Sequence, residues 1–369
     1  MGPAIAVGAN IYRHRKESRL TQDDLARHLG VTKASVSKWE TGQSYPDVEL
    51  LPRIATCFGI TIDELIGYEP QMSRENIQRE CARLREAFAT EPFEAAHDAC
   101  QQLVRDYYSC YPLIAQIALL YLNHLDLAGS SRREELASEA IGLCRRIRRR
   151  SESSADVRLA ESVEASFQLA IGNPQAAVEA LGDARIVDMG ADILLANAYD
   201  ALGKADEADK IMQGALFQST VLNLNRLAQL GMLSIDNPSK LHAAHGRACA
   251  LIDTFDLEDV YVNAAAIHLS FAIAFCMGGN VDRALDCLED YERASTKLEF
   301  PIKLHGDAFF DKIESWLEDV NVVGTSTPRD DALNKKSLVE SVANNPAFVS
   351  LADNPRFKRV VKSLEEIAR

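Results

Sequence analysis

The sequence lacks the features of a secreted or membrane-spanning protein. Its eight cysteines are scattered, and none belongs to a C-x-x-C pair. This spacing indicates neither a disulfide framework nor a cysteine zinc site, so we expect free thiols in a reducing cytoplasm. The longest apolar run, 264–278, contains His268 and Ser270 and is short for a membrane span. No signal peptide opens the chain, and we expect a cytoplasmic protein that does not bind membranes.

Motifs of enzymes and metal sites are missing as well. There is no phosphate-binding loop, no nucleophile elbow and no pair of catalytic carboxylates. His242 and His245 lie on one helical face, but no third ligand follows at metal spacing. We therefore predict no catalytic residue, no metal and no cofactor, and not an enzyme. Strand-like alternation is also absent, while apolar residues recur every three or four positions, which predicts an all-α fold.

Acidic charge is present in excess but is unevenly distributed. The 369 residues, enough for two or three domains, carry a formal net charge of −14. Residues 1–68 contain eight bases and eight acids, so the remainder carries the whole excess. Only the first segment is electrostatically suited to DNA.

Residues 20–39 predict two short helices joined by a tight turn. Thr21 and Asp24 can form an acidic capping box, Gly30 can end the first helix, and Thr32 can cap the second. The outer face of the second helix is short, polar and free of acids, as a helix entering the major groove requires. We expect a preceding helix, 8–18, with Ile11 facing inward. Its outward residues are predicted to be Tyr12, Arg13, Arg15 and Lys16.

This stretch resembles the helix-turn-helix of Cro/repressor-type (XRE-family) regulators, and the five-helix frame extends from about residue 11 to 67. The resemblance rests on Ala26, Gly30, Val31, Ser35, Val36, Ser37, Trp39, Glu40, Gly42, Tyr45, Pro46 and the apolar pattern of 50–65. It implies that base edges are reached by Lys33, Ala34, Ser37 and Lys38. It further implies that the DNA backbone is contacted by Gln22, Thr32, Ser35, Ser44 and Tyr45. For each residue the alternative is a solvated polar position.

A repeat appears when three glycines are aligned. Gly172, Gly203 and Gly279 each have alanine five residues later and a large apolar residue nine residues later. The middle copy, 194–216, resembles a tetratricopeptide repeat, which implies an α-solenoid. The order of the two parts resembles the peptide-pheromone-sensing (RRNPP-type) regulators. That resemblance implies a groove in which asparagines hold a peptide, with Asn123, Asn197 and Asn263 as effector-binding candidates, and helix-surface positions as the alternative.

We predict four regions in the chain. They are a DNA-binding domain (1–68), a linker and connecting helix (69–88), a repeat domain for effector binding and dimerisation (89–322), and a linker with C-terminal capping helices (323–369). Pro346 and Pro355 break the last region. These final helices cover the last repeat or form a loosely attached tail.

The combined prediction is a dimeric transcriptional regulator that senses signals such as quorum peptides. Because two usable lysines bind weakly, we expect a homodimer on a near-palindromic operator in double-stranded DNA. A short peptide or small molecule in the repeat domain would control it. Alternatives are a constitutive repressor whose repeat domain binds a protein partner, and a non-enzymatic adaptor without DNA affinity.

Overall fold

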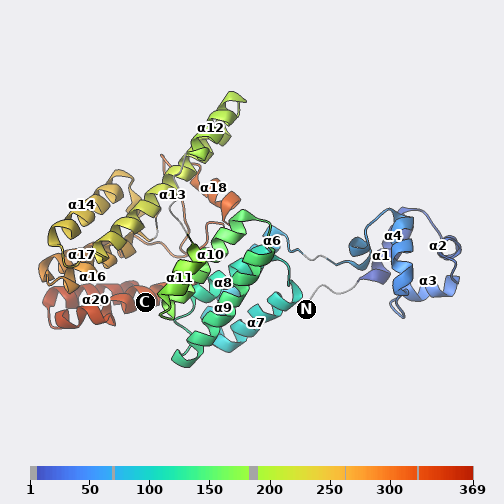
Figure 1. Cartoon of the computed structure of the whole chain (residues 1–369), viewed down its shortest axis with the longest axis horizontal. Coiled ribbons are helices and arrows are strands. Elements are labelled where there is room, and N and C mark those ends of the chain that lie inside the picture. The colour runs from blue at the N-terminus through green and yellow to red at the C-terminus, as the bar shows by residue number, and fades with distance from the viewer. Residues whose placement is uncertain (1–5, 69–70, 183–189, 262, 322–323, 369) are drawn as a thin grey trace.

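The computed structural model describes residues 6–68, 71–182, 190–261, 263–321 and 324–368 (Figure 1). Throughout these ranges the elements are helices, and the one extended pairing is an isolated bridge between Lys303 and Ser326. The predicted all-α fold, a five-helix repressor-like domain followed by repeat-like helices, is confirmed. Within the described ranges no helix is both long and apolar enough to cross a membrane.

The N-terminal part is a small bundle around its own core. Its elements are α1 (Val7–Glu17), α2 (Gln22–Leu29), α3 (Lys33–Glu40), the 3-10 turn η1 (Val48–Leu50), α4 (Leu51–Phe58) and α5 (Ile62–Ile66). Ile11, Leu25, Val36, Ile54 and Leu65 are fully buried in this core, one from each α-helix. Figure 1 shows these helices grouped together, with the rest of the helices in a separate body. Each part therefore has its own hydrophobic core.

The body begins with antiparallel helices around a second core. These are α6 (Arg74–Thr90), α7 (Phe93–Asp106), α8 (Tyr111–Asn123), α9 (Ser130–Arg150), α10 (Ser154–Ala170) and α11 (Pro174–Leu181). Ser73 caps α6 by accepting a hydrogen bond from the Asn76 amide. The core is dense because α8 is apolar on nearly every side, from Leu113 to Tyr121.

The three aligned glycines form the turns of three helix pairs. Gly172 joins α10 to α11, Gly203 joins α12 (Ala191–Ala201) to α13 (Ala205–Met232), and Gly279 joins α16 (Ala264–Met277) to α17 (Val281–Thr296). Their φ angles are +75°, +75° and +77°, a left-handed conformation that favours glycine. The alanines five residues later are buried where the paired helices meet, and they are Ala177, Ala208 and Ala284.

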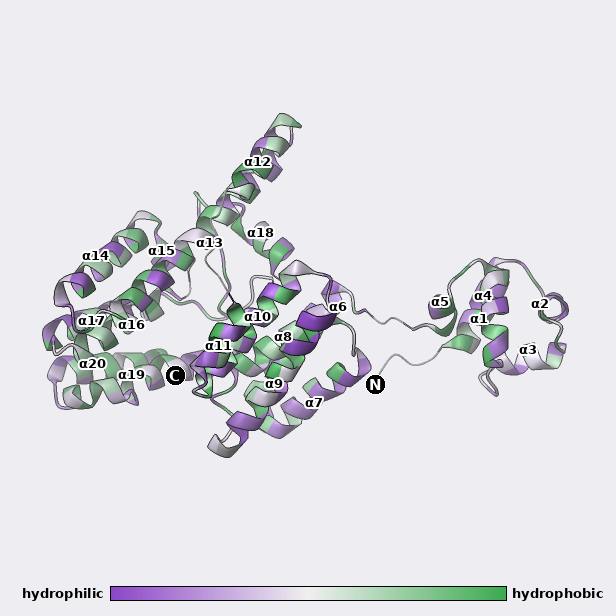
Figure 2. Cartoon of the chain, in the orientation of Figure 1, coloured by the Kyte–Doolittle hydropathy of each residue, from purple (hydrophilic) through white to green (hydrophobic). Residues whose placement is uncertain are grey.

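The apolar positions nine residues after each glycine do not behave alike. Leu288 is fully buried, whereas Leu181 and Met212 are exposed by 43% and 37%. The position nine residues after the glycine is therefore buried in one of the three copies only. Figure 2 shows the middle pair at the edge of the body, with α12 projecting from it.

The remaining helices build a third core around α13, α16 and α17. They are α14 (Pro238–Thr254), α15 (Leu257–Val260), α18 (Ile313–Val320), α19 (Asp331–Ala343), the 3-10 turn η2 (Pro346–Leu351) and α20 (Pro355–Ile367). Phe348, Phe357 and Val360 join this core. Arg356 also pairs with Asp286 and Glu289 of α17, at 2.8 and 2.7 Å. The C-terminal helices thus pack on the last repeat pair and are not a loose tail, while the predicted domain boundaries stay predictions.

Candidate DNA interface and effector cavity

The turn between α2 and α3 is held by caps at both ends. The Thr21 hydroxyl accepts a hydrogen bond from the Asp24 amide at 3.1 Å, and the Asp24 carboxylate accepts one from the Thr21 amide at 3.0 Å. Gly30 ends α2 with φ +73°, and Thr32 caps α3 by accepting from the Ser35 amide. All four predicted cap residues therefore have the geometry expected of them.

The outer face of α3 is exposed and free of acids. Val36 and Trp39 anchor the helix in the core, so Lys33, Ala34 and Lys38 face solvent. Within the described part of the chain neither lysine has a carboxylate partner. Both ammonium groups are therefore available to an external anion.

Glu40, the last residue of α3, is turned inward and held by Arg15. The guanidinium donates to both carboxylate oxygens, at 2.5 and 2.9 Å, and both side chains are at most 5% exposed. A third Arg15 nitrogen donates to the Leu20 carbonyl at 2.8 Å. Arg15 was expected to face outward, and that expectation is wrong. It follows Val7 and Ile11 at intervals of four, a helical spacing that places it on the buried face.

Gln22 joins this buried pair at the start of α2. Its amide nitrogen donates to the Glu40 carboxylate at 2.8 Å. An amide nitrogen carries two hydrogens, so the second one can reach a phosphate from this position. Although burial of Glu40 favours the neutral acid, the hydrogen bonds from Arg15 and Gln22 outweigh it and hold the pKa of Glu40 below its usual value. The network therefore fixes α1, α2 and α3 relative to one another while Glu40 stays ionised.

The remaining DNA-contact candidates differ in how much of each side chain is free. The Thr32 and Ser35 hydroxyls lie 2.8 Å apart and serve the cap of α3. Ser37 and Ser44 are half-buried, and Tyr45 is 69% exposed beyond the end of α3. All of them border the α3 surface or its following loop, and their contacts with DNA stay predictions.

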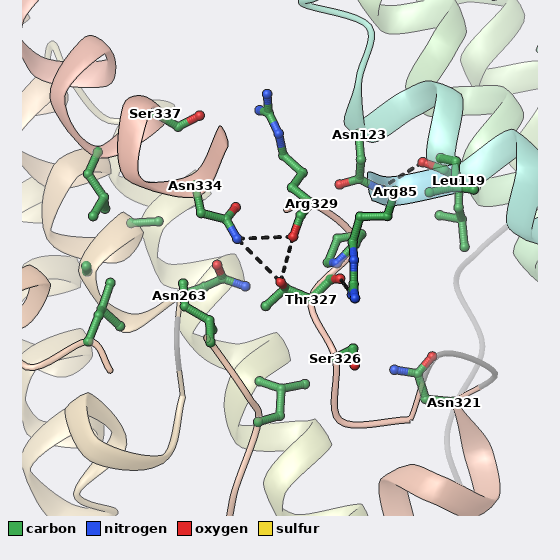
Figure 3. A pocket seen from close by; sticks show the side chains of 18 of the residues that line it. Arg85, Leu119, Asn123, Asn263, Asn321, Ser326, Thr327, Arg329, Asn334 and Ser337 are labelled. Atoms are coloured by element: carbon green, nitrogen blue, oxygen red, sulfur yellow. Dashed lines mark hydrogen bonds between the residues drawn. The ribbon is translucent and has the colours of Figure 1, made fainter. Parts of the chain in front are cut away.

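The body contains a cavity of about 580 Å³ between its two halves (Figure 3). Helices α6 and α8 form one wall, α16, α17 and α19 form the other, and segments 298–304 and 326–329, together with Asn321, complete it. Asn123 and Asn263 line this cavity, as does Asn334, whose role the sequence did not suggest. Asn197 is exposed on the projecting α12, so the structure does not bring it to the same site.

One cavity wall is a segment that sequence reasoning treated as a linker. Residues 324–330, which we call the strap, are held by side chains from distant helices. Arg85 of α6 donates to the Thr327 carbonyl at 2.6 Å, and Asn334 donates to the Thr327 hydroxyl at 3.3 Å. The Leu304 amide donates to the Thr325 carbonyl at 2.8 Å. No local pattern reveals these contacts, because their partners lie up to 242 residues away.

The cavity wall combines apolar surface with amides and cations. Six amide side chains line it, namely Gln78, Gln116, Asn123, Asn263, Asn321 and Asn334. Over the described residues, the lining includes two arginines and no acid, in a protein of net charge −14. No group of acidic, histidine or cysteine side chains in the described ranges could hold a metal ion. The cavity is therefore suited to an organic ligand rich in hydrogen-bond acceptors.

Comparisons with known proteins match the N-terminal part. The "Helix-turn-helix" family profile covers residues 11–65. The transcriptional activator BcrR of Enterococcus faecalis is 46% identical over 55 residues, which are 15% of this chain and 27% of BcrR. The uncharacterised regulator MJ0272 of Methanocaldococcus jannaschii is 38% identical over 56 residues, which are 15% of this chain and 85% of that protein. This chain belongs to the helix-turn-helix family of transcriptional regulators. The predicted resemblance of this stretch is thereby confirmed.

Each of these two alignments spans 15% of this chain, and the alignment with BcrR spans about a quarter of that protein. Among solved structures, apo ComR from S. thermophilus is 15% identical with a TM-score of 0.27, covering 85% of this chain and 98% of ComR. Apo ComR from Streptococcus vestibularis gives 14% identity and a TM-score of 0.27, covering 88% and 99%. Both superpositions are loose.

Proposed function

We propose that this protein is a sequence-specific DNA-binding transcriptional regulator, dimeric and controlled by a ligand in the body cavity. The observation that carries the proposal is the outer face of α3. It is exposed, basic and acid-free, and the Arg15–Glu40 pair holds it on a rigid frame. A recognition helix needs this combination, because its side chains must approach base edges at fixed positions.

The proposed contacts follow from side-chain chemistry. Lys33 and Lys38 donate to guanine edges or phosphates, and Ala34 is small enough to contact a thymine methyl. Gln22, at the positive end of α2, donates to a phosphate with its free amide hydrogen. Ser37 supplies a further hydroxyl near the bases, while Thr32, Ser35, Ser44 and Tyr45 lie toward the DNA backbone.

Dimerisation is proposed because the N-terminal part of one copy, residues 6–68, which we call the head, carries few cations for DNA, and the body is acidic. Two heads on a near-palindromic operator add their contacts, which compensates for repulsion between the body and DNA. Support comes from exposed apolar side chains of α11, of α12 and of the turn that follows α12, namely Val178 at 63%, Leu194 at 67% and Leu202 at 71%. Soluble proteins rarely leave such patches uncovered, and a two-fold contact would bury them on both copies.

Ligand control is proposed through α6, the helix that leads from the DNA-binding head into the cavity. At its start, Arg74 donates to the Asp319 and Asn321 carbonyls at the end of α18, both at 2.7 Å. Further along, Arg85 holds the strap. A ligand that binds one arrangement of α6 and the strap more tightly shifts the equilibrium toward that arrangement. The size of the shift is set by the difference in its affinity for the two forms, and the shift changes the spacing of the two heads. A short peptide fits the amide-rich wall, since amides can pair with both groups of a peptide backbone.

A second candidate function is a constitutive repressor whose body binds a protein partner. The observation favouring it is the same apolar surface on α11 and α12, which another protein could cover. The oligomeric state separates the two, because a partner-binding repressor would leave this surface open in the purified protein.

The deciding experiment is a DNA-binding titration with the full chain. Specific binding to its own upstream region is expected at low salt, with affinity falling steeply as salt rises because phosphate contacts release counterions. No preference over random DNA at low salt would contradict the proposal. A thermal-shift screen with short peptides then tests ligand control, since a bound ligand raises the melting temperature by mass action.

A further inference from the structure

Arg85 is a half-buried cation in the cavity wall that has no carboxylate partner among the described residues. Its Nη1 donates a hydrogen bond to the Thr327 carbonyl, a neutral acceptor. By contrast, Arg329 in the same wall pairs with Asp126 at 2.9 Å, and the neighbouring Arg83 pairs with Glu80 at 2.8 Å. A guanidinium has five N–H donors, so most of those of Arg85 remain available. Figure 3 shows this side chain beside the strap.

Gln116 of α8 provides a second, independent indication of a ligand. It lines the same cavity and is only 7% exposed, yet it has no hydrogen-bond partner within the described part of the chain. The Gln116 amide is not among the side-chain groups wholly cut off from solvent, so it remains accessible at the cavity wall. A ligand acceptor in the cavity could therefore bind the Gln116 amide, and the same cavity carries the positive charge of Arg85.

The rest of the wall defines the other end of the ligand. Apolar side chains line both walls, with Leu119 and Leu120 on α8 and, opposite them, Leu269 on α16 and Leu298, Ile302 and Leu304 in the segment after α17. The volume of about 580 Å³ is typical of a small-molecule site and not of a surface for a folded partner. The occupant should therefore be compact, with one anionic group and an apolar body.

We infer that the cavity binds a monocarboxylate with a compact apolar body, whose carboxylate is held by Arg85 and Gln116. The inference rests on the proposed ligand control and specifies the chemistry of that ligand. Two sources carry this chemistry, namely the C-terminus of a short apolar peptide and a medium-chain fatty acid. Arg85 pairs with the carboxylate while its Nη1 keeps the hydrogen bond to the Thr327 carbonyl of the strap. The ligand therefore contacts both α6 and the opposite wall of α16, α17 and α19.

The test compares four probes on the full chain by thermal shift and calorimetry. N-acetyl-trileucine and its C-terminal amide represent peptides, and octanoate and octanol represent fatty chains. At least one acid should bind, and its neutral counterpart should bind at least about ten-fold more weakly, as expected for a lost charge-assisted hydrogen bond. Whichever acid binds identifies the source. Equal binding of acid and neutral forms, or no binding of either acid at millimolar concentration, overturns the inference.

Matched variants separate the site from general effects on the fold. Arg85→Gln should remove the preference for the acid, whereas Arg83→Gln, two residues away and 52% exposed, should leave it unchanged. If Arg85→Gln does not fold, Gln116→Leu, which removes the amide at similar volume, should still weaken acid binding several-fold. An unchanged preference in the folded variants contradicts the inference. Operator binding is measured in parallel. Intact DNA binding with no acid preference refutes only this inference, and acid binding without DNA binding refutes only the proposed function.

Discussion

Glu40 is the only acid of α3, and its burial removes the negative charge from the exposed surface of this helix, the proposed DNA contact. The same carboxylate compensates the charge of Arg15, which would otherwise be buried without a partner. One residue therefore serves both the stability of the head and the electrostatics of the recognition face.

Replacing Glu40 by Gln should destabilise the N-terminal part by about 3 kcal/mol, because Arg15 then lacks its counter-charge. In the wild type, the pKa of Glu40 is lowered by folding, so this contribution is present above the ordinary value of 4.5 and is lost as pH falls below it. Urea unfolding measures both effects, followed by tryptophan fluorescence in a Trp316→Phe background so that only Trp39 reports. Glu49→Gln, an exposed change, is the control, and a variant as stable as wild type at neutral pH would contradict the role of the pair.

The two lysines of α3 should each matter for DNA binding and not for stability. Lys33→Ala and Lys38→Ala are expected to weaken operator binding by about 1–3 kcal/mol each if the ammonium contacts a base edge. A phosphate contact would instead weaken all sequences alike and reduce the salt slope by about one unit. Fluorescence anisotropy over a salt series distinguishes these outcomes, with Lys240→Ala on the body as the control. Unchanged affinity in both variants would remove α3 from the interface.

At the scale of elements, the glycine turns organise the helix pairs. Gly203 adopts φ +75° between α12 and α13, and Ala208, five residues later, packs between the two helices. The sequence spacing found these turns because their backbone conformation restricts the residue type locally. It did not find the strap, which is positioned by Arg85 and by a bridge near Lys303.

Two glycine-to-alanine changes should have opposite effects on the free energy of unfolding. Gly203→Ala places a side chain in a left-handed conformation and should destabilise the body by about 1 kcal/mol or more. Gly142→Ala lies mid-helix in α9, where an added Cβ meets no atom within 4 Å, and should stabilise by about 0.5–1 kcal/mol. Thermal unfolding of both variants gives the comparison. A stabilising Gly203→Ala would mean that the turn differs from the one described.

For the whole molecule, charge and apolar surface act together. In the proposed function, the acidic body leaves DNA contact to the head, and the uncovered side chains around α11 and α12 favour association of bodies. Strength of DNA binding and oligomeric state should therefore be linked, since each head alone carries little positive charge.

A double variant tests that link. Leu194→Glu with Leu202→Glu places charges on the projecting α12 and should convert a dimer of about twice 40.7 kDa into a monomer in light scattering. Operator affinity should fall with it, while Val349→Glu, at an exposed apolar site near the C-terminus, should change neither. A wild-type monomer that binds its operator tightly would contradict the dimer.

The sequence by itself determined the local features of this protein. Caps at Thr21 and Thr32, glycine turns and helical periodicity depend on residues a few positions apart, so the all-α fold and the α3 surface were predictable. The buried position of Arg15 was also in the pattern and was missed. Only the tertiary structure decided what long-range packing brings together. It placed Asn123, Asn263 and Arg85 in one cavity, left Asn197 outside it, and made a wall from the strap, because these contacts join residues that no local periodicity relates.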